Sequence, residues 1–149
     1  MTRLMLRIET LHHVSLSVTD LARARRFYGD VLGLTEIERP SFDFPGAWYQ
    51  LGDRQLHIIV HTIPLSLRGT TEIDSRDGHF AIRVQNYRQT LEHLRAHDVP
   101  VRESPRNPTP WAQLHITDPD GNVIELNAEG DEPATHPSIT TETHAGETR

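Results

Sequence analysis

The sequence predicts an α+β domain that contains the same structural unit twice. Strand-like alternation begins at Leu11 and begins again at His79. A capped helix follows each of these segments, and three more strand-like segments follow each helix. A chain of 149 residues is long enough for one compact domain with a real core. We therefore expect a single domain over residues 11–129, with its two units at about 11–61 and 79–127.

The first unit begins with residues 11–18, in which apolar and polar side chains alternate as in a half-buried strand. Thr19 or Asp20 can cap the helix that follows, whose apolar stripe has helical spacing and which ends at Gly33. Three further segments with the pattern of short strands complete the unit, at 34–38, 47–51 and 55–61.

The second unit repeats this order. Residues 79–84 form its first expected strand, and Asn86 caps a helix with apolar residues at helical spacing. The sequence Asp118-Pro119-Asp120-Gly121 predicts a tight turn, because proline suits the second position and glycine tolerates a positive φ. The remaining strands are expected at 101–103, 111–117 and 122–127.

Three stretches fall outside the two units. Residues 62–78 carry a proline, glycines and a polar end, and we expect a linker or lid there. Residues 1–10 are expected to be a lead-in. Residues 130–149 are rich in Thr, Glu and His with few apolar side chains, which predicts a disordered tail.

Composition excludes several classes of function. The net charge of −6 disfavours nucleic acid and anionic membranes as partners. The absence of cysteine excludes disulfides, thiolate metal sites and a cysteine nucleophile. No apolar run approaches the ~20 residues of a membrane span, and no signal-peptide pattern is present, so we expect a cytoplasmic protein. Ten histidines favour a metal or acid–base site.

The repeat places four possible metal donors at matching positions. His13 and His79 open the first strand of their units, while His57 and Glu125 lie on the last strands. Alternation puts each of the four on the face away from the helices. If the helices cover one face of each sheet, the four side chains converge on the opposite, concave face.

Such a group of side chains fits a divalent ion, which needs three or four N and O donors at about 2.0–2.2 Å. His13, His79 and Glu125 supply three donors, and His57 supplies a fourth. We expect one divalent transition metal per site, and without thiolates Zn, Ni, Fe, Mn and Co all fit.

Other polar residues share the concave face. Glu125, His57 and His115 are the candidate catalytic groups for proton transfer. Ser15, Arg83 and Gln113 are expected to line a substrate pocket. Alternatively, the histidines lie at solvated strand ends and the other polar side chains line the sheet without a functional role.

The segments HHVSLSVTDLARARRFYGDVLGL at 12–34, HFAIRV at 79–84 and DPDGNVIEL at 118–126 resemble the vicinal oxygen chelate superfamily. This superfamily includes glyoxalase I, fosfomycin-resistance enzymes, extradiol dioxygenases and bleomycin-binding proteins. The resemblance implies paired βαβββ modules that form an open, cupped mixed sheet around a metal. It also implies a homodimer in which two chains share each site.

By this resemblance His13, His79 and Glu125 fall on the family's metal positions, and His57 falls where glyoxalase-like members usually carry a fourth donor, commonly Glu. The expected function is that of a glyoxalase-like lyase/isomerase acting on a small oxygen-chelating substrate. A fosfomycin-type activity is disfavoured, because no Lys or Arg occurs between Glu125 and Arg149 to hold a phosphonate.

Two alternative functions remain open. In an Fe(II) extradiol-type dioxygenase, His13, His79 and Glu125 would form the two-histidine, one-carboxylate facial triad. In a non-catalytic, bleomycin-resistance-like dimer, a drug or metabolite would lie in a groove lined by aromatic side chains, with Trp48, Trp111, Phe42 and Phe44 as candidates.

Overall fold

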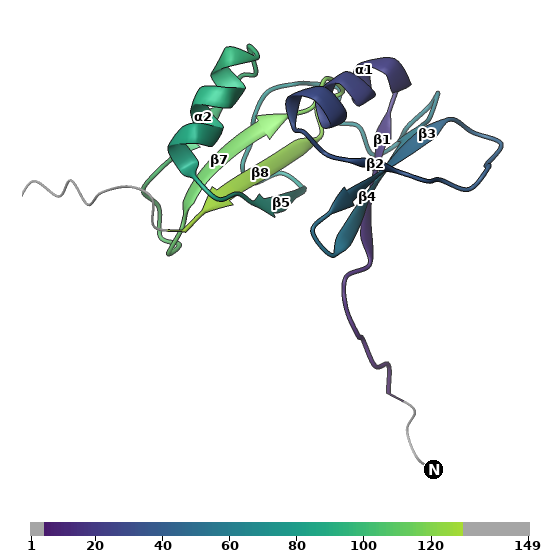
Figure 1. Cartoon of the computed structure of the whole chain (residues 1–149), viewed down its shortest axis with the longest axis horizontal. Helices are drawn as coiled ribbons and strands as arrows, with labels where there is room; N and C mark the ends of the chain where they lie inside the picture. Colours follow the sequence, from purple (N-terminus) through teal and green to yellow (C-terminus); the bar gives the residue numbers. More distant parts are fainter. Residues whose placement is uncertain (1–4, 130–149) are drawn as a thin grey trace, which may run out of the picture.

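The computed structural model describes residues 5–129; the first four residues and the tail at 130–149 lie outside the described part of the chain. The α+β class is confirmed, with two four-stranded mixed sheets and helices on one side of them (Figure 1). The described lead-in residues contain neither helix nor strand. Throughout residues 5–129, no helix is long and apolar enough to cross a membrane.

The first sheet has the strand order β1-β4-β3-β2. β1 runs parallel to β4, whereas the other neighbouring pairs are antiparallel. The strands lie close to the positions that the alternation predicted, at β1 (His13–Val18), β2 (Glu36–Ile37), β3 (Gly46–Leu51) and β4 (Arg54–Val60).

The helix of the first module differs in part from the expected α-helix. It begins as α1 (Leu21–Arg25), where the Asp20 side chain accepts a hydrogen bond from the Arg23 amide. It continues as the π-helix η1 (Arg26–Val31), in which the Leu32 amide donates to the Phe27 carbonyl at 2.9 Å. Apolar spacing alone does not distinguish this wider turn from an α-helical one.

The second module repeats the arrangement. Its sheet has the order β5-β8-β7-β6, with β5 parallel to β8. The Asn86 side chain caps α2 (Tyr87–Ala96) by accepting from the Gln89 amide at 2.8 Å. The strands are β5 (His79–Arg83), β6 (Arg102–Ser104), β7 (Ala112–Thr117) and β8 (Val123–Ala128).

The eight strands form one four-stranded mixed sheet in each module, which agrees with the paired βαβββ modules that the resemblance implied. β1 and β5 are edge strands of their sheets, as are β2 and β6 at the opposite edges, and in the described chain β1 pairs with β4 alone and β5 with β8 alone. Their outer edges therefore keep backbone groups that no other strand of the described chain satisfies.

The predicted tight turn before β8 ties the modules together. The buried Asp118 carboxylate accepts a hydrogen bond from the Tyr28 hydroxyl of η1 at 2.6 Å. Asp120 accepts from the Thr19 amide at 3.1 Å and forms an ion pair with Arg23 at 2.9 Å. These contacts fix the first helix over the end of the second sheet, where Figure 1 shows it.

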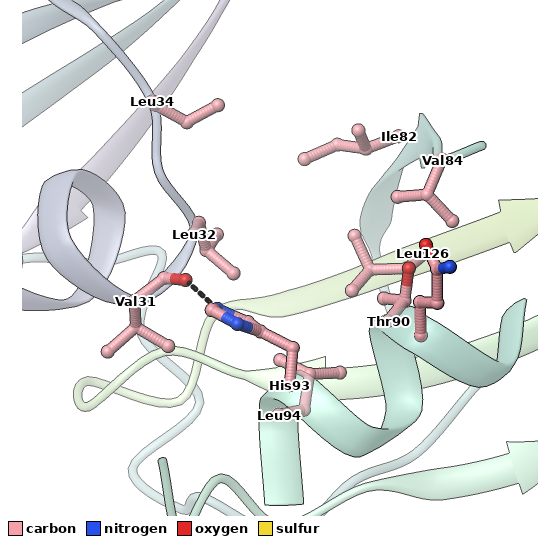
Figure 2. A pocket seen from close by; sticks show the side chains of 10 residues that line it. Val31, Leu32, Leu34, Ile82, Val84, Thr90, His93, Leu94 and Leu126 are labelled. Carbon is pink, nitrogen blue, oxygen red and sulfur yellow. Dashed lines mark hydrogen bonds between the residues drawn. The ribbon is translucent and has the colours of Figure 1, made fainter. Parts of the chain in front are cut away.

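The helix side of the molecule also contains an apolar pocket of about 370 Å³ between the modules (Figure 2). His93 of α2 donates from Nε2 to the Val31 carbonyl at 2.6 Å across it. The apolar lining comes from both modules, with Val31, Leu32 and Leu34 from the first and Ile82, Val84 and Leu126 from the second.

We expect the turn glycine Gly121 to be required for stability. Its φ is 88°, and a Cβ there would lie 2.0 Å from the Thr70 carbonyl oxygen. Gly52 also has a positive φ, 60°, but a Cβ there meets nothing within 4 Å. Gly121→Ala should therefore lower the free energy of unfolding by about 2 kcal/mol more than Gly52→Ala, as measured by denaturant titration. Equal losses of unfolding free energy in the two variants would show that the close approach of Gly121 to the Thr70 backbone does not contribute to the cost of the substitution.

Candidate metal centre

Three donor side chains meet on the second sheet. His79 from β5, His115 from β7 and Glu125 from β8 each offer a ligand atom, and these atoms lie within 4.8 Å of one another. Strand pairing produces this, because His115 lies directly opposite Glu125. The Nε2 atoms of His79 and His115 lie 3.3 and 3.6 Å from Oε2 of Glu125.

The Glu125 carboxylate is held in one orientation. Its Oε1 accepts hydrogen bonds from Gln113 at 3.0 Å and Asn127 at 2.8 Å, so Oε2 is the oxygen that faces the histidines. Burial raises the pKa of Glu125, but these hydrogen bonds and the nearby His115 and His79 outweigh it, and the pKa is lowered. The buried side chain is thus ionised at neutral pH.

The hydrogen bond on the far side of His79 fixes its tautomer. Nδ1 lies 2.7 Å from the Asp77 carbonyl oxygen, and because a carbonyl can only accept, Nδ1 carries the hydrogen. A neutral His79 then turns the lone pair of Nε2 toward the Glu125 carboxylate. Two acceptors at 3.3 Å repel each other unless a cation, either a metal ion or a second imidazole proton, lies between them.

His115 is well suited to be a neutral donor. Its side chain is buried, and its pKa is lowered mainly by that burial, against the opposing effect of Glu125. Its Nδ1 is buried without a hydrogen-bond partner. From the sequence, His115 is a candidate for proton transfer, and that role stays a prediction. The strand register that sets His115 opposite Glu125 is the signal that the sequence alone did not supply.

The two remaining predicted donors lie together on the first sheet. The His13 ring stacks on His57 with centroids 4.0 Å apart, and Trp48 stacks on His57 at 3.9 Å. Nε2 of His57 is engaged with the Gln55 side chain at 2.8 Å. Burial, then His13, His12 and Arg39, lower the pKa of His57 to about 4.

The four predicted donors therefore form two groups within one chain. His79 and Glu125 meet His115 on the second sheet, and that group of ligand atoms does not include His13 or His57. The donor chemistry of the second-sheet group fits a divalent ion, since imidazole nitrogens and a carboxylate are ligands that such ions accept. The assignment of all four residues as ligands stays a prediction.

Cavities between β1 and β5 bring residues of both modules together. One, of about 480 Å³, is lined by His13 and Arg83, and another, of about 470 Å³, by Ser15 and His79. Of the expected pocket residues, Ser15 and Arg83 thus line cavities, while Gln113 is engaged with Glu125. Figure 1 shows β1 and β5 on the facing sides of the two sheets.

Comparison with known proteins defines the class. The family model for the Glyoxalase/Bleomycin resistance protein/Dioxygenase superfamily matches residues 10–126, and the chain belongs to this superfamily. A curated relative is the Arabidopsis thaliana protein Glyoxylase I 4, 27% identical over 124 residues, which are 81% of this chain and 71% of the relative. The uncharacterized Escherichia coli protein YaeR is 30% identical over 129 residues, covering 82% of this chain and 98% of YaeR.

Solved structures share the fold. A Bacillus anthracis protein assigned to the glyoxalase family aligns with a TM-score of 0.70 at 23% identity, over 85% of this chain and 100% of that one. A mutant of the Listeria monocytogenes fosfomycin resistance protein FosX, complexed with Mn(II) and a dihydroxypropylphosphonic acid, aligns at 0.66 and 19% identity, over 83% and 95%. At these identities the likeness establishes the fold alone.

The low pKa of His57 predicts a pH-dependent stability. Since the folded pKa is about 4 against an ordinary 6.5, the unfolded chain binds this proton more readily, and stability falls as the pH drops through this window. His57→Phe keeps a stacking ring and removes the titration. We expect it to lose less unfolding free energy than the wild type between pH 7 and pH 5 in denaturant titrations. Unfolding free energies of the wild type and the variant that fall in parallel over this pH range would contradict this prediction.

Proposed function

We propose that the protein is a metal-dependent enzyme whose divalent ion is held on the second module by His79, His115 and Glu125. The main support for this proposal is the geometry around Glu125. Gln113 and Asn127 occupy one of its carboxylate oxygens, and the Nε2 atoms of two histidines lie near the other. The hydrogen bond from His79 to the Asp77 carbonyl is of the kind that orients metal-bound histidines in general.

We further propose a homodimer with shared sites, in which His13 reaches the ion from the first module of a second chain and His57 lies behind it. Two observations support this arrangement. Within one chain, the group of donor atoms does not include His13, and both β1 and β5 have unpaired outer edges in the described residues. A symmetric pair of chains satisfies such edges and brings the modules together.

The reaction that fits this centre best is a glyoxalase-like lyase or isomerase step on a small substrate with adjacent oxygens. The ion, when bound, supplies Lewis-acid stabilisation of the oxyanion that develops. Glu125 is ionised at neutral pH, so its carboxylate can accept a proton from carbon next to a carbonyl, while His115 holds the ion. His57, with a pKa of about 4, is a poor match for that task at neutral pH.

The donor set also favours a second candidate, an Fe(II) extradiol-type dioxygenase. Two histidines and one carboxylate on one side of an ion are the ligand set of non-haem Fe(II) oxygenases. Turnover of a hemithioacetal by the protein loaded with each candidate metal in turn tests the isomerase function. Oxygen uptake with catechols, in the Fe(II)-loaded protein, tests the dioxygenase.

Metal analysis tests the centre itself. After chelator treatment and reloading, we expect elemental analysis to find about one tightly held divalent ion per chain. His79→Ala and Glu125→Ala each remove a donor and should weaken binding by roughly 100-fold or more, while His97→Ala, at an exposed position on the end of α2, should not. A wild type that retains no transition metal would favour the non-catalytic binding protein instead.

Complementation between chains tests the shared site. A heterodimer of His13→Ala and Glu125→Ala chains, isolated with two different tags, has one centre with both changes and one with neither if the sites lie between chains. We expect it to regain metal binding at one site, while each homodimeric variant remains impaired. If each site lay within one chain, both centres of the heterodimer would stay damaged and no recovery would occur.

A further inference from the structure

We propose that the substrate of this centre is a planar aromatic acid, whose ring lies against Trp48 and Phe42 and whose carboxylate binds Arg39. The inference names the substrate class of the proposed enzyme and rests on that proposal for the chemistry. The binding surface itself is formed by described residues of the first module.

Five rings form a continuous array on this module. It begins with the stacked rings of His13, His57 and Trp48 described above and continues to Phe42, 6.1 Å from Trp48, and Phe44, 5.1 Å from Phe42. Trp48 lies opposite His57 in the strand register, so the array starts on the same sheet face as a predicted donor. It ends in the loop between β2 and β3.

The outer end of the array is exposed. Phe42 and Phe44 are 46% and 37% accessible, whereas His57 is 6% accessible. Adjacent exposed aromatic side chains commonly mark ligand-binding surfaces. A planar ring on such faces gains stacking of about 0.5–1.5 kcal/mol per ring beyond the burial of its area.

Arg39 supplies the charge at this end. Its guanidinium carbon lies 4.6 Å from the Phe42 ring centre and 5.0 Å from that of Phe44, and Nη2 donates to the Phe44 carbonyl at 2.9 Å. Its Nε is buried without a hydrogen-bond partner, and Arg39 forms no salt bridge with a carboxylate of residues 5–129.

The position of Arg39 therefore favours an anionic ligand. A guanidinium already held over two rings keeps N–H donors in a fixed fork, which matches a carboxylate. Rings and cation together fit an aromatic acid better than an aliphatic acid or a neutral aromatic compound.

Calorimetric titration with three probes tests this directly. The probes are 2-naphthoate, cyclohexanecarboxylate, which lacks the aromatic ring, and 2-naphthalenemethanol, which lacks the charge. We expect 2-naphthoate to bind at least tenfold more tightly than either of the others, in both metal-loaded and chelator-treated protein. Equal affinity for the aliphatic acid would overturn the role of the rings, and equal affinity for the alcohol would overturn the role of Arg39.

Matched variants locate the site. Arg39→Gln should abolish the preference for 2-naphthoate over the alcohol, while Arg25→Gln, at an arginine paired with Glu36 in the same module, should keep it. Phe42→Leu should abolish the preference over the aliphatic acid. Phe42 lies in an exposed loop, so its variant tests the site even if Trp48→Leu fails to fold.

The experiment separates this inference from the proposed enzyme. Stoichiometric metal without binding of 2-naphthoate would overturn the aromatic acid and leave the metal centre standing. Binding of 2-naphthoate that depends on Arg39, in a wild type without retained metal, would support the aromatic-acid site and overturn the metal-dependent reaction.

Discussion

The hydrogen bonds of Asp118 are the constraint on which the rest of the structure depends. This buried carboxylate accepts from the Tyr28 hydroxyl of the first module and from the Asn122 amide group and backbone of its own turn. Burial and the adjacent Asp118 raise the pKa of Tyr28 well above its ordinary value, so the hydroxyl remains a donor. One turn thus positions the first helix and sets the start of β8, the strand that carries Glu125.

Glu125 depends in turn on amide side chains of its own sheet. Gln113 and Asn127 lie opposite each other on β7 and β8, and both donate to the same carboxylate oxygen. These two hydrogen bonds fix the Glu125 side chain in one orientation, so that its second oxygen faces the two histidines. Such preorganisation lets a site bind an ion without ordering its ligands at the moment of binding.

Much of this was predictable from the sequence, and the exceptions have physical causes. Alternation located the strands and the face of His79 and Glu125, because a strand has a side-chain period of two. The pairing of His115 with Glu125 was not predictable, since it requires the register between β7 and β8. The π-helix was not predicted, because apolar spacing does not distinguish its wider turn from an α-helical one. The ligand roles and the cytoplasmic location remain predictions.

The duplicated strand pairs point to a division of labour between the halves of the chain. Trp48 lies opposite His57 in the first half, at the place where His115 lies opposite Glu125 in the second. Two side-chain differences at this one cross-strand position thus separate an aromatic surface from the proposed metal centre. If the two halves derive from one βαβββ unit, two point changes at this position account for the difference between the proposed recognition surface and the proposed metal centre.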